Sequence, residues 1–433
     1  MSRPIRQALS TSGLINTVYK QFEKIPDPRK FNTNLFIPLK EHLMSGLAIF
    51  GLKFPSLLQY DRGRKKLPIE ENLKNLYHVN TPPSDTYLRE RLDMVDPKSL
   101  RPAFKQLFAK LQRGKCLENF EYFEGHYLLS IDGTGKFSSS NISCKHCCKK
   151  EHNNGQVTYY HQMLGGCIVH PDQSNVIPFC PEMIQNIDGN EKNDCERNAA
   201  KRFIENFRRE HPHLKVIAVQ DGLASNGPYI EFLEEKNIKY ILGAKSGDHA
   251  YLFEQLEKSE ESKYFEIREE NGTFHQFRFI NNLSLNKSHQ DLKVNIIEYR
   301  ETRANGKELN FSWVTNISIT ENNVYQLMRG SRARWKIENE TYNTLKNLGY
   351  NFEHNYGHGK EYLASVFCTL MVLSFFIDQI QEIACHLFQL MRKEAGTYRT
   401  LWQRMRTFFE YFIMPSWEEF YQLIARQKTP NTS

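Results

Sequence analysis

Apolar residues recur at helical spacing through the first quarter of the chain, in segments such as PLKEHLMSGLAIFGLKFPSLLQYD. In TPPSDTYLRERLDMV, a proline pair and Ser84 precede Leu88 and Leu92, which is typical of a helix start. The segment PKSLRPAFKQLFAKLQRGK carries one apolar stripe opposite basic residues, formed by Leu100, Phe104, Leu107, Phe108 and Leu111. The pattern predicts a small helical bundle with basic faces.

From about residue 121 the pattern changes to short apolar runs typical of strands. EGHYLLSIDG, VTYYHQMLGGCIVH and NVIPFCPEMI predict three strands, and DCERNAAKRFIENFRRE predicts a helix after them. The segments LKVIAVQDG, GPYIEFLEEKN and IKYILGAKSG then alternate as strand, helix and strand. This order predicts an α/β fold in which helices cover a mixed sheet.

A β-rich stretch follows, with Asn-Gly steps at 271–272 and 305–306 as hairpin signals, and the helical pattern then returns and continues to the end. Five regions are therefore expected. They are a basic helical region at 1–120, the first part of a catalytic core at 121–249, an all-β insertion at 250–325, the second part of the core at 326–390, and C-terminal helices at 391–433 as a possible dimer contact.

The composition of the 433-residue chain, 40% hydrophobic and 25% charged, is that of a soluble globular protein. The apolar run ASVFCTLMVLSFFI is too short for a membrane span and predicts a buried core helix. The N-terminus has no apolar signal-peptide region, so we expect a cytoplasmic protein whose nine cysteines are reduced.

Positive charge is concentrated near the N-terminus. Residues 1–120 hold 21 Lys and Arg against 11 Asp and Glu, a surplus larger than the net charge of +7 for the whole chain. A localised basic region suits a polyanion such as nucleic acid, because each neutralised phosphate releases counterions. A basic face that serves solubility alone is the alternative.

Two aspartates end apolar runs and are each followed by glycine: Asp132 in LLSIDGTG and Asp221 in AVQDGL. Ligands of open α/β sheets gather at the carboxyl ends of strands. A ribonuclease H-like site holds two Mg²⁺ ions about 3.5–4 Å apart with carboxylates from separate elements. A helix that packs over the sheet would supply the third carboxylate, and Glu338 fits, with Arg334 one turn before it and Tyr342 one turn after.

With these residues the chain resembles the DDE transposases of bacterial insertion sequences, in the cut-and-paste group with a long β insertion before the catalytic Glu. The resemblance rests on SIDGTG, on VIAVQDGL followed by YILGAK, and on RARWKIEN followed by LKNLGYNFEHNYGHG. The three carboxylates are 89 and 117 residues apart, which leaves room for the insertion. The similarity covers about residues 120–360.

The resemblance implies a ribonuclease H-like fold in which Asp132, Asp221 and Glu338 are catalytic and bind two Mg²⁺ ions, with Mn²⁺ as a substitute. It implies double-stranded DNA as partner, both the terminal inverted repeats and the target, and a homodimer that bridges two DNA ends. Cleavage, release through a DNA hairpin and strand transfer would take place at the bacterial nucleoid in the cytoplasm, without a membrane partner. The alternatives are another ribonuclease H-like nuclease and an inactive DNA-binding relative.

Relatives mark the third motif with Tyr, Arg, Glu and Lys. Arg334 and Glu338 match, but Ser331 stands at the Tyr position and Lys346 lies one residue beyond the expected Lys. This leaves Glu340 as the alternative third ligand. The basic residues predicted to contact DNA phosphates are Arg334, Lys346 and Lys245. Trp313 is either a base-stacking residue, as a Trp is in some relatives, or a half-buried strand residue.

Cys144 and Cys147, in SCKHCCKKEH, have the spacing of a zinc half-site. Its possible completions are His146, Cys148, His152, His161, Cys167, Cys180 and Cys195. No second Cys-x-x-Cys follows, so the sequence favours free thiols in a loop after the first core strand and leaves zinc as the alternative.

Overall fold

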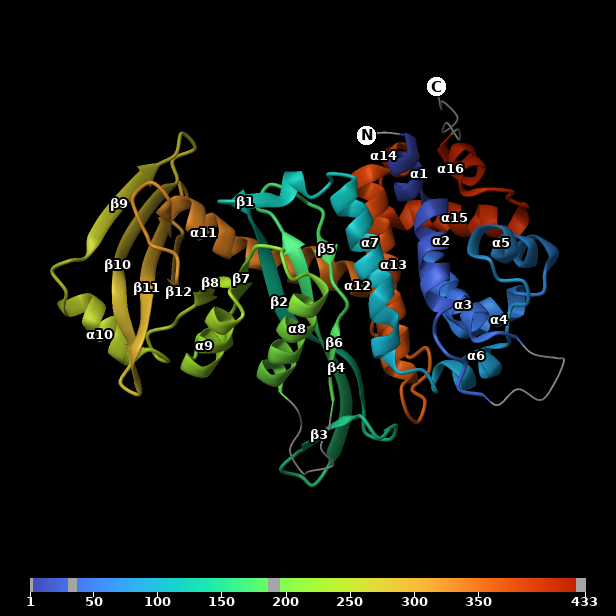
Figure 1. Ribbon diagram of the computed structural model, residues 1–433, viewed down its shortest axis with the longest axis horizontal. Helices are drawn as coiled ribbons and strands as arrows, with labels where there is room; N and C mark the ends of the chain where they lie inside the picture. Colours follow the sequence, from blue (N-terminus) through green and yellow to red (C-terminus); the bar gives the residue numbers. More distant parts are fainter. Residues whose placement is uncertain (1–2, 30–36, 186–194, 426–433) are drawn as a thin grey trace.

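The computed structural model describes residues 3–29, 37–185 and 195–425, and one mixed sheet of twelve strands forms its centre (Figure 1). The strand order is β3-β4-β2-β7-β8-β12-β11-β10-β9, with β1 beside β2 and with β5 and β6 beside β4. The strands are β1 Glu121–Phe123, β2 His126–Ser139, β3 Cys148–Glu151, β4 Val157–Val169, β5 Ile177–Pro178, β6 Glu182–Ile184, β7 Val216–Gln220, β8 Lys239–Gly243, β9 Lys263–Arg268, β10 Phe274–Asn286, β11 His289–Thr302 and β12 Glu308–Thr315.

The core half of the sheet confirms the expected mixed α/β arrangement. β2 and β4 pair antiparallel, whereas β7 pairs parallel with both β2 and β8. Every residue of β7 is buried, as expected for a parallel strand with both faces covered. The helices that follow these strands are α8 Glu196–Glu210, the short η3 Gly222–Ala224 and α9 Gly227–Glu235.

Two adjacent glycines in β4 allow close packing on the two faces of the sheet. A Cβ at Gly166 would lie 2.1 Å from the Phe203 ring of α8, and a Cβ at Gly165 would lie 2.7 Å from the hydroxyl of Tyr342. Because neighbouring strand residues point to opposite faces, α8 and the segment with Tyr342 cover opposite sides of the core sheet.

The insertion departs from the all-β expectation in two ways. It begins with a helix, α10 Ala250–Lys258, whose Leu252, Phe253 and Leu256 are buried at helical spacing. Its last strand, β12, pairs with β8, so β9 to β12 continue the core sheet. Periodicity alone does not show which strands pair, because strand pairing depends on residues far apart in sequence.

Helices from both ends of the chain form one body beside the sheet (Figure 1), whereas α11, η4 and η5 pack on the core sheet itself. Those before the sheet are α1 Arg3–Leu9, α2 Thr11–Phe22, α3 Leu39–Gly51, α4 Leu57–Gly63, α5 Leu67–Tyr77, α6 Asp85–Leu92, η1 Pro97–Leu100, α7 Arg101–Arg113 and η2 Glu118–Phe120. Those after the insertion are α11 Val324–Arg332, η4 Ala333–Trp335, the π-helix η5 Ile337–Tyr342, α12 Asn343–Asn347, α13 Leu363–Ala384, α14 His386–Ala395, α15 Tyr398–Tyr411 and α16 Trp417–Ala425.

The long helix α13 is the centre of this helical body and packs against α3, α7 and α14. Among the described residues it is the one helix with the length and apolar composition to cross a membrane. Its most apolar window is completely buried by the rest of the protein, as expected for a core helix.

Polar contacts join the two ends of the chain. The buried Lys53 ammonium lies 2.5 Å from the Asp378 carboxylate of α13, and its Nζ lies 4.2 Å from the ring centroids of both Tyr350 and Trp402. The side chain of Asn72 in α5 donates to the carbonyl of Phe409 and accepts from the backbone of Met414. Helices predicted to lie in separate terminal regions therefore share one core.

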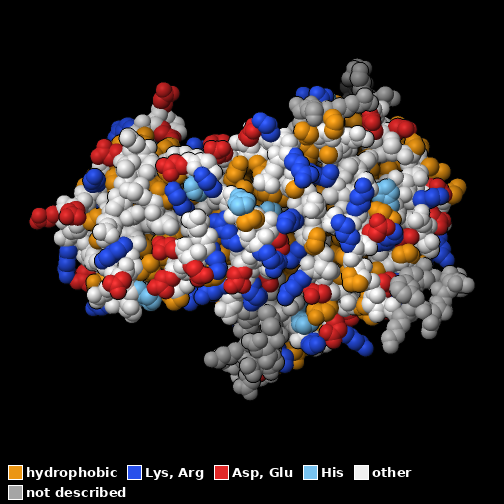
Figure 2. All heavy atoms as spheres, viewed as in Figure 1, with side chains coloured by type: hydrophobic (Ala, Val, Ile, Leu, Met, Phe, Trp, Pro, Cys, Tyr) orange, Lys and Arg blue, Asp and Glu red, His pale blue; other side chains and the backbone are white. Residues whose placement is uncertain are grey.

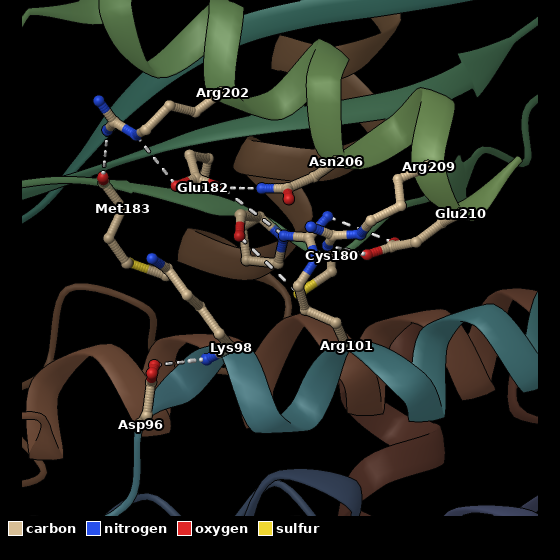
Figure 3. Close-up of polar contacts among 11 residues, drawn as sticks. Asp96, Lys98, Arg101, Cys180, Glu182, Met183, Arg202, Asn206, Arg209 and Glu210 are labelled. Atoms are coloured by element: carbon tan, nitrogen blue, oxygen red, sulfur yellow. Dashed lines mark hydrogen bonds and ion pairs between the residues drawn. The ribbon is translucent and has the colours of Figure 1, made fainter. Parts of the chain in front are cut away.

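A second polar network joins the helical body to the sheet (Figure 3). The Arg101 guanidinium at the start of α7 lies 2.6 Å from the Glu210 carboxylate of α8 and 3.6 Å from that of Glu182 in β6. Arg202 also pairs with Glu182, at 3.2 Å. Figure 2 shows Lys and Arg side chains, with Asp and Glu among them, over the middle of the molecule. The ion pairs of Arg101 and Lys53 show that part of the N-terminal positive charge is used inside the protein.

Candidate active site

The register of the core sheet places the two predicted aspartates at the same level of neighbouring strands. In the parallel pairing of β2 with β7, Ser130 lies beside Val219. Asp132 and Asp221 each follow two residues later, so both reach the same level of the sheet. Asp221 directly follows the end of β7, but Asp132 lies within β2, which continues to Ser139 and does not end at Asp132 as the sequence predicted. The structure thus brings together two residues that are far apart in sequence.

Glu338 is linked to Asp132 through the side chain of Arg334. One guanidinium nitrogen of Arg334, Nη1, donates to Asp132 Oδ2 at 3.3 Å and to Glu338 Oε1 at 2.8 Å. Arg334 lies in η4, and Glu338 lies in the π-helical turn η5. Such π-helical turns are frequent at functional sites because they shift side chains out of the regular helical register.

Backbone contacts hold the Glu338 segment on the sheet. The Tyr342 hydroxyl donates to the carbonyl of Asp132 and accepts from the backbone N–H of Gly165. The hydroxyl of Ser130 donates to the carbonyl of Arg334 at 3.0 Å. These bonds fix the segment that carries Arg334 and Glu338 above β2, independently of the charges at the site.

A fourth carboxylate, missed in the sequence, lies at this site. The Glu196 side chain at the start of α8 lies against Gly133, where an added Cβ would be 2.8 Å from Glu196 Oε2. The backbone N–H of Gly133 favours the charged form of this carboxylate, and Asp221 disfavours it. Its only sequence signal is an acid in the first turn of an amphipathic helix, which many structural helices share.

Burial and neighbouring acids raise the pKa values of Asp132 and Glu196. Burial raises the pKa of Asp132 to about 7, with Glu196 and Glu338 adding to the rise and Arg334 opposing it. Burial also raises the pKa of Glu196, and Asp221 adds to that rise. Carboxylates that repel each other in a partly dehydrated site gain stability from a bound cation.

The site opens into a groove of about 1070 Å³ between the core and the β9–β12 strands. Asp221 and Arg334 lie on its core side. Basic and aromatic residues line it as well, namely Lys245, Arg278, Arg300, Arg332, Tyr264, Phe311, Trp313 and Trp335. The acids Asp248, Glu257, Glu266 and Glu298 line it too, so the groove is mixed in charge. Its cations can bind phosphates and its aromatic side chains can stack on bases.

The three residues predicted to bind phosphate occupy different settings. Arg334 bridges the carboxylates, and Lys245 is an exposed residue of the groove wall. Lys346 in α12 pairs with Glu353 at 3.0 Å and is not among the groove residues. The alternative ligand Glu340 lines a neighbouring hollow that also includes Lys336, whereas Glu338 contacts Arg334, a residue of the groove that contains Asp221.

The two tryptophans of the groove differ in exposure. Trp313 is 6% exposed and stacks on Phe311 with the ring planes 9° apart, which agrees with the structural alternative. Trp335, directly after Arg334, is 53% exposed and lines the groove. Its position in a short helical turn beside the site brings it to the surface, and periodicity did not distinguish it from a core residue.

Comparisons with known proteins leave the family open. No protein-family model matches the chain, and no curated protein matches it. Among solved structures, the chain is similar to a piggyBac transposase determined by cryo-EM in a synaptic complex with hairpin DNA. The two are 12% identical, the match covers 99% of this chain and 86% of that chain, and the TM-score is 0.38. A TM-score this low does not establish a shared fold.

Proposed function

We propose that this chain is a DNA transposase of an insertion sequence, with Asp132, Asp221 and Glu338 as its catalytic carboxylates. The observation that carries the proposal is the register of β2 and β7, which aligns the two aspartates, with Glu338 linked to Asp132 through Arg334. The strand arrangement supports a ribonuclease H-like core: an antiparallel β2–β4 pair, short strands beyond β4, and parallel β7 and β8 on the other side of β2.

The donor set fits Mg²⁺, because hard divalent cations take oxygen ligands. The resting site already contains a cation, the Arg334 guanidinium, between Asp132 and Glu338. The raised pKa of Asp132 also indicates that the acids lack sufficient compensating positive charge. Two bound Mg²⁺ ions, or Mn²⁺ in their place, would activate the attacking oxygen and stabilise the leaving oxygen of a phosphodiester.

The protein's own residues would orient the DNA. Lys245 on the groove wall and Arg334 beside the carboxylates would each contact a phosphate. The exposed ring of Trp335 is placed to stack on a base that leaves the duplex near the site. A homodimer on paired DNA ends, with action at the bacterial nucleoid, completes the proposal.

Cleavage and joining of DNA ends test this proposal directly. The substrate is a fragment that spans the gene and its flanks, incubated in Mg²⁺ or Mn²⁺ with wild type, Asp221→Asn and Glu340→Gln. We expect cuts at both element ends and joined products with wild type and Glu340→Gln, and neither with Asp221→Asn. Cleavage without joining would indicate a nuclease. Binding of the ends without cleavage in either metal would indicate an inactive DNA-binding relative.

A further inference from the structure

A second group of metal-ligand side chains lies away from the carboxylates. Cys144 and Cys147 belong to the loop between β2 and β3, His161 belongs to β4, and His358 lies between α12 and α13. One ligand atom from each of these four residues lies within 4.8 Å of every other. Two of the four are candidates that the sequence pairs by Cys-x-x-Cys spacing, and His358 is a completion that the sequence analysis did not include.

The distances among these atoms match the edges of a zinc tetrahedron. Zn–S bonds of about 2.3 Å and Zn–N bonds of about 2.0–2.1 Å give S–S edges of about 3.8 Å and S–N edges of about 3.5 Å. The two Sγ atoms lie 3.8 Å apart. His161 Nε2 lies 3.2 Å from Cys144 Sγ and 3.4 Å from Cys147 Sγ, and His358 Nε2 lies 3.3 Å from Cys147 Sγ.

The surroundings distinguish this group from a pair of free thiols. Cys147, His161 and His358 are buried, and Cys144 is partly buried. The backbone N–H of Cys144 donates to Cys147 Sγ at 3.4 Å, a contact that stabilises a thiolate. The Sγ atoms are too far apart for a disulfide. Both imidazoles direct Nε2 at the same sulfur, an arrangement that one shared cation satisfies better than two weak S–H donors do.

We propose that Cys144, Cys147, His161 and His358 bind one Zn²⁺ in a closed structural site. Two thiolates and two imidazoles in tetrahedral arrangement select zinc among the common divalent ions. With four protein ligands no position remains for water or substrate, so the ion has a structural role.

The position of the site indicates that the ion links two segments near the candidate active site. The ion would join two parts of the chain. One is the loop after β2, the strand that contains Asp132, and the other is the segment after α12, the helix that directly follows the turn of Glu338. Weaker contacts run alongside: Lys145 donates its backbone N–H to the carbonyl of Lys360 at 3.5 Å, and its side chain pairs with Glu361 at 3.4 Å. The zinc would thus fasten together two segments that follow, along the chain, the elements that carry Asp132 and Glu338.

Metal analysis of the purified full-length chain, without added DNA, tests this inference. The protein is produced in zinc-supplemented medium, passed through a desalting column and measured for zinc and iron by mass spectrometry. The ligand variants are Cys147→Ser and His358→Asn. The matched controls are Cys195→Ser, an exposed cysteine, and His152→Gln, an exposed histidine near the same loop.

We expect about one zinc per chain in wild type and in both controls, and a loss of at least about five-fold in each ligand variant. Absence of zinc from wild type, iron in its place, or full zinc in Cys147→Ser would each overturn the assignment. If a ligand variant fails to fold, Co²⁺ exchanged into the wild-type protein provides the readout. Absorption bands of tetrahedral cobalt–thiolate coordination support the site, and their absence contradicts it. The Asp221→Asn variant should retain its zinc, which separates this test from that of the proposed function.

Discussion

The carboxylate site and the Cys/His cluster both adjoin the core sheet, but they differ in charge and in exposure. Asp132 and Glu338 are linked through the guanidinium of Arg334, a residue of the groove, and a fourth acid, Glu196, raises the pKa of Asp132. The Cys/His ligands converge within 4.8 Å and are mostly buried. Thiols and imidazoles can meet without a metal because they are neutral, whereas carboxylates repel each other and need a cation. The first arrangement suits exchangeable metal and substrate, and the second suits a permanent ion.

The largest effect that we expect is a loss of DNA cleavage when the carboxylate site is changed. Glu338→Gln should reduce DNA cleavage by at least about 1,000-fold, because removing one metal ligand costs several kcal/mol of transition-state stabilisation. Glu340→Gln, in the neighbouring hollow, should stay within about three-fold of wild type. Single-turnover cleavage of an end-containing DNA measures both. The reverse ranking would move the third ligand to Glu340.

At the Cys/His cluster we expect substitutions to change the free energy of unfolding rather than the rate of DNA cleavage. If the Cys/His cluster binds zinc, a free zinc concentration about 1,000 times its Kd adds about 4 kcal/mol to the free energy of unfolding. Cys147→Ser should lose this gain, whereas Cys195→Ser should keep it. Urea unfolding with buffered zinc measures the difference. Equal zinc dependence in both variants would contradict a separate closed site.

The crowded acids should make stability depend on pH. Asp132 has a pKa of about 7 in the folded chain against 3.8 ordinarily, so the folded state holds a proton that the unfolded state releases. Stability from this group therefore falls as pH rises from about 4 to about 7, by on the order of 4 kcal/mol. In metal-free buffer Asp132→Asn should flatten this slope and be the more stable protein at pH 8. Chemical unfolding at several pH values, with Asp172→Asn as an exposed control, checks this.

The smallest effect distinguishes the two lysines predicted to bind phosphate. Lys245→Ala should lower the slope of log affinity against log salt by about one, because one phosphate contact is lost. Lys346→Ala should leave this slope unchanged, because Lys346 pairs with Glu353 outside the groove. Fluorescence anisotropy with labelled end DNA at several salt concentrations measures both. Equal slopes for the two variants would remove Lys245 from the groove contacts.

Local patterns predicted most elements but not their partners. The apolar runs that end at Asp132 and Asp221 predicted two buried strands of a mixed sheet, and both strands are present. The all-β expectation for the insertion was wrong at α10, where three apolar residues at helical spacing cover β10. The joining of β12 to β8 depends on contacts between distant segments, which no local period encodes.

The sequence by itself determined the chemical inventory: two aspartates after apolar strands, an Arg-Glu pair one turn apart, and a Cys-x-x-Cys step. Tertiary structure decided which residues meet. It aligned Asp132 with Asp221 through strand register, added Glu196, exposed Trp335 in place of Trp313, and brought His358 to the cysteines. The physical reason is that spacing along a chain sets local periodicity, whereas electrostatic repulsion and metal-ligand geometry act through space between residues that folding brings together.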